Sequence, residues 1–282
     1  MKIGFLGYGE AARAFHDGLS RAALAHDILL DCDDGAMRGA MLGNGATPVP
    51  IAGLADADWV FSAVTADQSL LAVAQLLPHL RQGQVLIDIN SVSPGRKRET
   101  AAAVEAAGAV YLDMAVMAPV HPKKHATPVL LAGKPAEQML PQLLALGFSA
   151  TLVGPEPGSA TAIKMVRSLF VKGLEAITVE TLLAARASGC FDEIYASLSA
   201  SYPGLDWSRF AGYQFERTTR HGRRRAAEMR ESGATLDALG LHGALACEIA
   251  AVQDAMGAAG VVAEAPLPDT VQQVLQRRIR KA

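Results

Sequence analysis

A glycine-rich turn lies almost at the start of the chain. The apolar run 2–6 leads into the letters GYGEAA at residues 7–12, which follow the spacing G-x-G-x-x-A and open a helix-like segment. In such a turn the first glycine allows the bend, the second lets a pyrophosphate approach the backbone, and the third small residue lets helix and strand pack closely. Amides at a helix start also attract phosphate. We therefore predict that a dinucleotide contacts Gly7, Tyr8, Gly9, Glu10 and Ala11; the alternative is a plain tight turn.

Acidic residues follow the second apolar run, which we place at Ile28–Asp31. Asp31 and Asp33 stand about 20–25 residues beyond the glycines, where an acid binds the ribose 2′-hydroxyl. An acid there repels a 2′-phosphate, which favours NAD over NADP. Arg38 would support NADP instead, and the acids could also simply cap the next helix.

Two further apolar runs end in polar residues. They are followed by Val64-Thr65 and by Asn90-Ser91, and we expect both pairs at the carboxyl edge of the sheet, where open α/β folds bind ligands. Val64, Thr65 and Asn90 are predicted to contact the cofactor, and Asn90 and Ser91 the substrate. The alternative for the polar pair is ordinary strand-end turn chemistry.

A lysine with apolar neighbours follows the breaker cluster Gly154–Gly158. Hydride transfer between an alcohol carbon and a nicotinamide needs a group that takes or gives the hydroxyl proton. A lysine shielded from water can do this, because desolvation lowers its pKa. Lys164 lies between Ile163 and Met165, just past the hinge, and we expect it to face a cleft. The alternative is an ordinary lysine whose stem covers apolar surface.

In the first part of the chain, strands and helices that alternate along the sequence must position these residues. Short runs rich in Val, Ile and Leu alternate with helix-like segments, which predicts a Rossmann-type, doubly wound parallel sheet. The expected strands are 2–6, 28–31, 59–64, 85–89, 110–112 and 129–132, and the expected helices are 10–23, 35–43, 69–80 and 95–107.

Long helical patterns replace the strands in the second part. We expect helices over 159–188, 191–201, 207–230 and 236–256. The chain is therefore predicted to hold a nucleotide-binding α/β domain at 1–155 and an all-helical domain at 156–282, with the hinge at Gly154–Gly158.

Together these blocks resemble the β-hydroxyacid dehydrogenase family, which includes 6-phosphogluconate and 3-hydroxyisobutyrate dehydrogenases. Beside the glycine turn, residues 88–94 (DINSVSP) resemble the family's substrate loop, and residues 113–133 match the ends and length of its D-A-P-V-S-G-G … V-G-G segment. Residues 158–164 (GSATAIK) resemble its G-x-G-x-x-x-K. The resemblance implies that Lys164 carries general acid/base catalysis and that the helical domain forms a homodimer.

The chain also departs from the family pattern. Met117-Ala118-Pro119 replaces the Ser-Gly-Gly that holds a substrate carboxylate, and Ser168 replaces an asparagine. The family's lysine–aspartate pair in the C-terminal domain is not evident. In its place is a basic run that contains His221 and Arg225. The resemblance therefore implies a divergent branch whose C-terminal domain has no assigned function, with Met117, Ala118, Pro119, Ser168, His221 and Arg225 as candidate substrate contacts.

Two cationic segments allow other interpretations. The loop His121–His125 could bind an anionic substrate group or be a solvated loop, and its spacing does not favour a metal. The run Arg217–Arg225 could suggest nucleic acid. However, flanking glutamates and a net charge of −2 favour a solvated helix face, so no nucleic-acid partner is expected.

Bulk features agree with a cytoplasmic protein. The three cysteines are far apart, which predicts neither disulfides nor a zinc site and fits a reducing compartment. We find no signal-peptide pattern and no apolar run of the length a membrane helix needs.

The sequence thus predicts an NAD(P)-dependent oxidoreductase that moves a hydride between nicotinamide and a small hydroxy acid or sugar-acid-like substrate. Lys164 is the predicted acid/base. The first alternative is an imine or ketone reductase, motivated by the missing Ser-Gly-Gly. The second is a non-catalytic dinucleotide sensor, motivated by the missing asparagine and lysine–aspartate pair.

Overall fold

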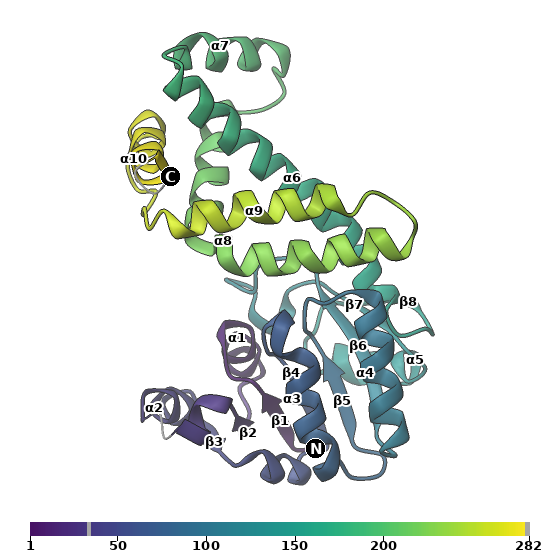
Figure 1. Ribbon diagram of the computed structural model, residues 1–282. Coiled ribbons are helices and arrows are strands. Elements are labelled where there is room, and N and C mark those ends of the chain that lie inside the picture. Colours follow the sequence, from purple (N-terminus) through teal and green to yellow (C-terminus); the bar gives the residue numbers. More distant parts are fainter. Residues whose placement is uncertain (33–34, 280–282) are drawn as a thin grey trace. The chain divides into compact units, whose positions relative to one another are not determined.

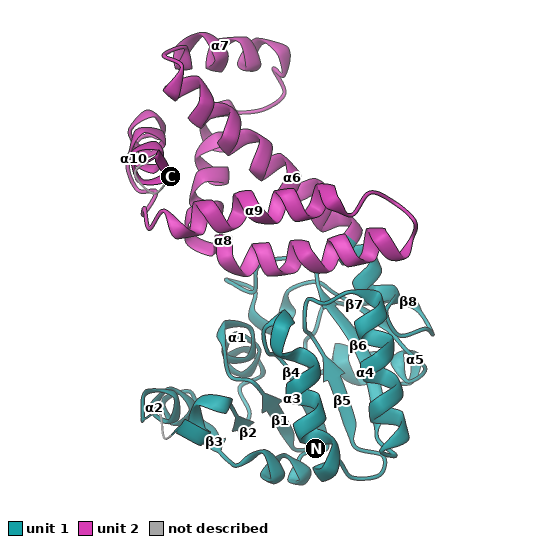
Figure 2. Ribbon diagram, viewed as in Figure 1, with its two compact units in different colours: residues 1–165 teal, residues 166–282 magenta. Residues whose placement is uncertain are grey.

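The computed structural model describes residues 1–32 and 35–279, so the predicted cofactor contact Asp33 lies outside the described residues. The chain divides into two compact units, Met1–Met165 and Val166–Ala282 (Figure 2). Helix α6 (Ser159–Ala187) contains the division, which lies C-terminal to the breaker cluster where we expected the hinge (Figure 1).

The N-terminal unit is built on an eight-stranded sheet with the order β3-β2-β1-β4-β5-β6-β7-β8. All neighbouring strands are parallel except β6 and β7. The first six strands in this order form the doubly wound arrangement of a Rossmann fold, which confirms the predicted fold class. The strands are β1 (Ile3–Leu6), β2 (Ala23–His26), β3 (Ala46–Pro48), β4 (Trp59–Ser62), β5 (Val85–Asp88), β6 (Val110–Val116), β7 (Val129–Ala132) and β8 (Ala150–Gly154).

Residues that alternate along the central strands enter two separate hydrophobic clusters. Phe5, Phe61 and Ile87 belong to one cluster, whereas their neighbours Leu6, Val60 and Leu86 belong to the other. Because successive side chains of a strand point to opposite faces, the sheet is buried on both sides. The helices of this unit are α1 (Glu10–Leu19), α2 (Gly35–Gly43), α3 (Ser69–Leu76), α4 (Pro94–Ala106) and α5 (Ala136–Ala145).

The second predicted strand was wrong. Residues Ile28–Cys32 form a short 3-10 helix, and the strand is Ala23–His26, of which the sequence analysis placed Ala23 in the first helix and the other residues in no element. That helix stops at Leu19, where Ser20 adopts a left-handed conformation. Alanine has a low strand propensity, but β2 pairs with β1 and β3 on either side, and this pairing overrides the propensity.

Two further strands and two α-helices of the described residues were not predicted. Strand β3 has three residues and includes Pro48, and β8 is partly exposed at the end of the sheet, so neither shows a long apolar run. Helix α5 has Pro141 in its interior, which weakens the helical signal. The second missed α-helix is the C-terminal helix α10 (Leu267–Ile279).

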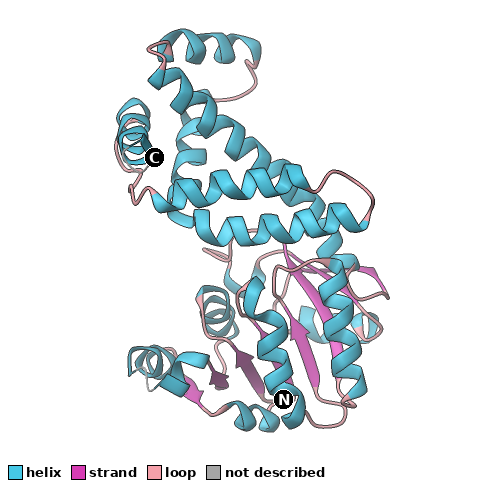
Figure 3. Cartoon of the chain, in the orientation of Figure 1, coloured by secondary structure: helices cyan, strands magenta, loops and turns pink. Residues whose placement is uncertain are grey.

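The described residues of the C-terminal unit form helices joined by loops and no strand, as the cyan and pink ribbons of Figure 3 show. Beyond α6 it contains α7 (Phe191–Ser201), α8 (Trp207–Ala238), α9 (Ala244–Ala258) and α10 (Leu267–Ile279). Helices α8 and α9 pack very closely, because a Cβ atom on Gly222 would lie 2.2 Å from the carbonyl oxygen of Gln253. The all-helical prediction for this part is confirmed.

Candidate active site

The glycine turn after β1 has the backbone that the sequence pattern requires. Gly7 has φ +82°, and a Cβ atom there would lie 2.7 Å from a methyl carbon of Val64. Its N–H donates to the carbonyl oxygen of His26 over 2.8 Å, which ties the turn to the end of β2. Only glycine fits this position without displacing the loop that follows β4.

The start of α1 is open beside the second glycine. Gly9 is the N-cap residue of α1 and offers no side-chain cap, and a Cβ atom built on it would meet nothing within 4 Å. The third small residue, Ala12, is fully buried. A crowded Gly7, an open Gly9 and a packed Ala12 are the features that a pyrophosphate at a helix start needs, so these residues fit a bound dinucleotide.

The other predicted residues of the turn differ in exposure. The Tyr8 side chain is buried, and its hydroxyl lies 2.6 Å from Nδ1 of His16 and accepts a hydrogen bond from Asn44. Burial raises the pKa of this hydroxyl. Glu10 is exposed and Ala11 is half-buried. The tyrosine ring therefore belongs to the core, and only its backbone lies in the turn.

The acid at the end of β2 is Asp27. Its carboxylate accepts hydrogen bonds from the N–H groups of Tyr8, at 2.8 Å, and Leu29, at 3.1 Å. Asp31 lies in the 3-10 helix instead, with a side chain 60% exposed and 3.9 Å from the His26 ring. The premise that Asp31 ends a strand was therefore wrong, and Asp27 holds the position beside the glycine turn.

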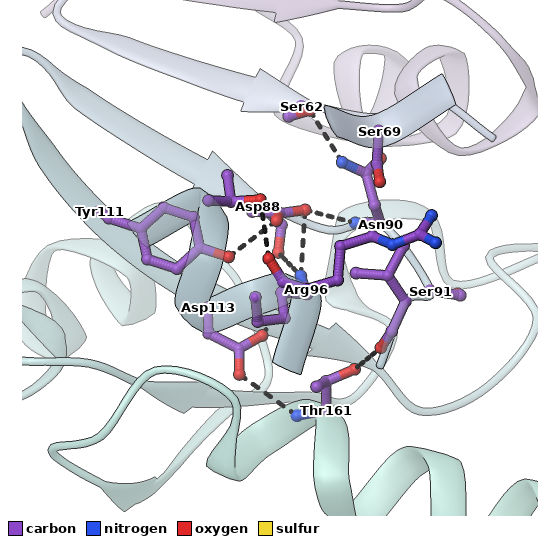
Figure 4. Close-up of polar contacts among 12 residues, drawn as sticks. Ser62, Ser69, Asp88, Asn90, Ser91, Arg96, Tyr111, Asp113 and Thr161 are labelled. Atoms are coloured by element: carbon purple, nitrogen blue, oxygen red, sulfur yellow. Dashed lines mark hydrogen bonds and ion pairs between the residues drawn. The ribbon is translucent and has the colours of Figure 1, made fainter. Parts of the chain in front are cut away.

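Asn90 connects the ends of two strands. Its side-chain oxygen accepts from the N–H of Val64 over 2.7 Å, and its side-chain amide donates to Ser62 Oγ over 2.8 Å (Figure 4). Its backbone N–H donates to Asp88 Oδ1. The structure thus brings Asn90 and Val64 together as predicted, with both ends of the asparagine amide bonded to protein. Thr65, the next residue of the loop, is exposed.

Ser91 and Lys164 meet although they are far apart in the sequence. The Lys164 ammonium donates to Ser91 Oγ over 2.6 Å, and both side chains are half-buried. Ser91 belongs to the loop after β5, and Lys164 to the second turn of α6. A polar hydroxyl and an amine are therefore held together at the carboxyl edge of the sheet.

A buried group of charges lies next to this pair, around Asp88 in Figure 4. Lys97, on α4, is 0% exposed; its ammonium lies 3.0 Å from Asp88 Oδ1 and donates to the Asp88 carbonyl oxygen over 2.7 Å. Oδ1 of Asp113, which has no hydrogen-bond donor among the described residues, lies 3.3 Å from the same ammonium. The Tyr111 hydroxyl donates to Asp88 Oδ2. We call Asp88, Lys97, Tyr111 and Asp113 the buried charge cluster.

Burial shifts the pKa values of two residues of this cluster, Asp113 and Tyr111. It raises the pKa of the Asp113 carboxyl, and the Lys97 ammonium opposes that rise. It also raises the pKa of the Tyr111 hydroxyl well above its ordinary value, with further contributions from the charges of Asp88 and Asp113. The phenol therefore remains a hydrogen-bond donor to Asp88.

The remaining predicted contacts lie in several places. In the N-terminal unit, Met117 is half-buried after β6, and Ala118 and Pro119 are exposed. In the helical unit, Ser168 is buried and accepts from the Lys172 ammonium over 3.1 Å, and His221 is half-buried on α8. Lys172 also forms an ion pair of 2.9 Å with Glu228, so the helical unit does contain a lysine–carboxylate pair.

Arg225 is part of a buried network inside the helical unit. Its Nε donates to Glu175 Oε2 over 2.9 Å, and a second guanidinium nitrogen contacts the other oxygen of the same carboxylate. The Gln253 side chain also donates to Glu175. This geometry supports a structural role for Arg225.

The cationic loop His121–His125 packs against α1. The Lys124 ammonium lies 2.5 Å from Asp17, and the His125 ring packs edge-on against Phe148, with centroids 5.5 Å apart. Burial lowers the pKa of His125, which keeps the ring neutral. Lys124 and His125 of this loop therefore make contacts within the protein.

The described residues offer neither a metal-binding group of side chains nor a helix able to cross a membrane. Residues 1–32 and 35–279 contain no group of three or more His, Cys, Asp or Glu side chains arranged to hold a metal ion. Within the same ranges, no helix combines the length and apolar character needed to cross a membrane.

Sequence reasoning missed the positions of Asp27, Asp88, Lys97 and Asp113 in and beside the candidate site. The signal for Asp27 was present, since it follows the true β2 by one residue, but the wrong strand hid it. Asp88 and Asp113 are register partners on β5 and β6, and two adjacent buried carboxylates require a cation. That requirement would have pointed to Lys97, but the register is not readable from the sequence alone.

Models of two protein families match the chain. Residues 17–154 match the NAD binding domain of 6-phosphogluconate dehydrogenase, and residues 185–256 match a domain of unknown function, DUF1932. The N-terminal unit is therefore an NAD(P)-binding domain by this match, which begins after the glycine turn.

Relatives cover most of the chain. A conserved hypothetical protein from Sinorhizobium meliloti is 35% identical, with a TM-score of 0.74 over 98% of this chain and 96% of that one. The conserved protein MTH1747, of unknown function and described as similar to 3-hydroxyacid dehydrogenases, is 26% identical, with a TM-score of 0.70 over 97% and 99%. An uncharacterized 28.5 kDa protein of Methanothermus fervidus is 30% identical over 62% of this chain and 66% of that protein.

More distant structures share the fold alone. They include 3-hydroxyisobutyrate dehydrogenase from Mycobacterium tuberculosis in a structure with L-serine, at 16% identity and TM-score 0.71, covering 97% of this chain and 98% of that one. An imine reductase from Myxococcus stipitatus with NADP+ has 18% identity and TM-score 0.55, covering 99% and 100%. The two family matches and the relatives along the full chain show that this protein belongs to the 6-phosphogluconate dehydrogenase-like β-hydroxyacid dehydrogenase family, in the branch with a DUF1932 C-terminal domain.

Proposed function

We propose that the protein is an NAD(P)-dependent dehydrogenase of a small hydroxy acid or sugar-acid-like substrate. The observation that carries this proposal is the contact of 2.6 Å between Lys164 Nζ and Ser91 Oγ at the edge of an NAD(P)-binding domain. A half-buried amine beside a hydroxyl can both orient a substrate alcohol and exchange its proton. The hydroxyacid dehydrogenase relatives support the same substrate class.

Lys164 and Ser91 have separate roles toward the substrate hydroxyl. When bound, the cofactor supplies the hydride acceptor for oxidation or the hydride donor for reduction. In oxidation the neutral amine of Lys164 accepts the hydroxyl proton, and in reduction its ammonium returns a proton to the carbonyl oxygen. Ser91 Oγ, already bonded to Lys164, holds the substrate oxygen within reach of the amine. The Asn90 amide keeps the loop in place through its bonds to Val64 and Ser62.

Substrate binding extends to residues whose roles follow from their positions. Met117-Ala118-Pro119 lies after β6 and offers backbone and apolar groups, and Ser168 and His221 stay predictions from the sequence. Arg225 is not retained, because its guanidinium is bonded to Glu175 inside the helical unit.

NAD is the proposed cofactor rather than NADP. Asp27 stands at the end of β2 and about 20 residues beyond the first glycine, which is where an acid binds a ribose 2′-hydroxyl. Its negative charge would repel a 2′-phosphate. Asp27 therefore takes the role that the sequence analysis gave to Asp31 and Asp33.

An imine or ketone reductase is the second candidate. Apolar and proline residues replace the carboxylate-binding Ser-Gly-Gly at positions 117–119, and imine reductases share the fold. Such an enzyme would reduce cyclic imines and ignore hydroxy acids.

The test measures oxidation of L-serine and 3-hydroxyisobutyrate with NAD and NADP, beside reduction of cyclic imines. Lys164→Met should lower kcat by roughly 10²–10⁴-fold, because general acid–base catalysis contributes about that much. Nicotinamide fluorescence should show NADH binding unchanged. Lys134→Met is the control, since Lys134 is exposed and pairs with Glu105 on the surface. Activity only on imines would favour the second candidate, and NADH binding without any turnover would identify a sensor.

We further propose that two copies associate through the helical unit. Val166, Phe170, Leu174 and Ile177 are exposed on α6, and their spacing places them on one face of the helix. An exposed apolar stripe of this kind is typical of helix–helix interfaces.

A cytosolic location is also proposed. Cys32, Cys190 and Cys247 form no disulfide with one another, which fits a reducing compartment. Cell fractionation tests this proposal; recovery of the protein in a secreted or periplasmic fraction would contradict it.

A further inference from the structure

The first turn of α6 is capped by a carboxylate from the sheet. Asp113 Oδ2, on β6, accepts hydrogen bonds from the N–H of Gly158 over 3.0 Å and of Thr161 over 3.3 Å (Figure 4). A carboxylate is favourable here because it satisfies amides that have no partner within the helix and faces the positive end of the helix dipole. The cap fixes the start of the helix that carries Lys164.

The first turn of α6 also packs closely against the start of α4. Gly158 has φ +97°, and a Cβ atom on it would lie 2.9 Å from the carbonyl oxygen of Pro94, the first residue of α4. The start of α6 thus has little room to slide along the sheet edge.

Thr161 links the two segments that carry the candidate catalytic pair. Its hydroxyl donates to the carbonyl oxygen of Val92 over 2.8 Å, and its side chain is fully buried. Val92 directly follows Ser91, and Thr161 lies about one helical turn before Lys164. One buried hydrogen bond therefore joins the serine loop to the lysine helix.

The buried charge cluster contacts both the serine loop and the start of α6. Asp88 Oδ1 accepts from the N–H of Asn90, which sets the course of the loop toward Ser91. Asp113 caps α6, and the Lys97 ammonium lies between the two carboxylates. The serine loop and the start of α6 are thus both held, through Asp88 and Asp113, by the ammonium of Lys97.

We propose that Thr161 is a positioning residue, which together with the Asp113 cap holds Lys164 Nζ at Ser91 Oγ. Thr161 acts on the reaction only through its hydrogen bond to the backbone of the serine loop. The inference rests on the proposed function for its catalytic consequence, but the geometry of the lysine can be tested without a substrate.

The experiment compares Thr161→Val, which removes the hydroxyl and keeps the shape, with Thr161→Ser, which keeps the hydroxyl. The control is Thr178→Val, because Thr178 also lies on α6 but donates to its own helix at Leu174. Trinitrobenzenesulfonate modifies exposed amines, and peptide mass spectrometry gives the rate at each lysine as a function of pH, with Lys134 as internal reference. Kinetic constants are measured in parallel.

Thr161→Val should change the pH profile of Lys164 modification relative to Lys134 and lower kcat by roughly 10- to 100-fold, because small misplacements of catalytic groups cost about that much. The KM for the cofactor should not change. Thr161→Ser and Thr178→Val should behave like the wild type. If Thr161→Val does not fold, Thr161→Ala takes its place with the same expectation.

The possible outcomes separate the two proposals. Equal Lys164 modification in Thr161→Val and Thr161→Ser, with equal kcat, would overturn the positioning role. A changed modification profile in Thr161→Val, combined with full turnover of Lys164→Met, would remove the proposed acid/base role and leave the positioning role standing.

Discussion

The Lys97 ammonium lies 3.0 Å from Asp88 Oδ1, and neither side chain is more than 1% exposed. A second carboxylate, that of Asp113, lies 3.3 Å from the same ammonium. Burial of three charges is costly unless each is paired, so this arrangement persists only because one cation serves two carboxylates. Lys97, on α4 and directly beside the candidate active site, is therefore critical for stability.

Removing the cation should therefore destabilise the protein strongly. Lys97→Met leaves two neighbouring carboxylates buried without a counter-charge, and breaking such a pair costs about 3–5 kcal/mol. Urea denaturation should show a clearly lower free energy of unfolding. Lys134→Met removes a surface ion pair with Glu105 and should cost no more than about 1 kcal/mol. Equal stability of the two variants would contradict this account of the cluster.

Gly18 is predicted to be essential for the packing of the His121–His125 loop. A Cβ atom on Gly18 would lie 2.0 Å from Nδ1 of His125, so Gly18→Ala must displace the loop from α1. Gly39, also inside a helix, has nothing within 4 Å of a built Cβ. Gly39→Ala should therefore stabilise by about 0.5–1 kcal/mol, as expected for an open helix interior. Thermal unfolding should move in opposite directions in the two variants.

His125 should make stability depend on pH. Burial lowers the pKa of its ring in the folded protein below the ordinary 6.5, so the unfolded chain binds the proton more readily. The free energy of unfolding should then fall as the pH drops through about 6.5 and be retained above it. His125→Asn should reduce this dependence, whereas His242→Asn, at an exposed site, should keep it. An identical pH profile in wild type and His125→Asn would rule out the contribution.

The sequence predicted those parts of the fold that depend on local pattern. Helices α2 and α7 and strand β7 begin and end where expected, because their patterns and breakers lie in the same short segment. Strand β2 was misplaced because pairing with two neighbours, and not propensity, makes Ala23–His26 a strand. Lys164 and Ser91 were both named from sequence, but their contact depends on the path of the chain between them. The buried charge cluster required the register of β5 against β6, which no local pattern encodes.

Cofactor preference should respond to Asp27 rather than Asp31. Asp27→Asn keeps an oxygen that can accept from Tyr8 but removes the charge, so NADH affinity should fall by roughly 10-fold or more and NADPH should bind relatively better. Asp31→Asn, at an exposed position, is the matched control and should leave both affinities unchanged. Nicotinamide fluorescence titrations measure the four affinities. A larger shift in Asp31→Asn would restore the original assignment.

The exposed stripe on α6 should determine the oligomeric state. Phe170 is 69% exposed and Ile177 is 66% exposed on the same helix face, and burial of such side chains between two copies would stabilise a dimer. Phe170→Glu places charges in that interface and should convert the dimer to a monomer. Leu71→Glu is the control, since Leu71 is similarly exposed on α3 but lies outside the stripe. Analytical ultracentrifugation at micromolar concentration separates the species. A monomeric wild type would remove the dimer proposal, and a dimer that survives Phe170→Glu would place the interface elsewhere.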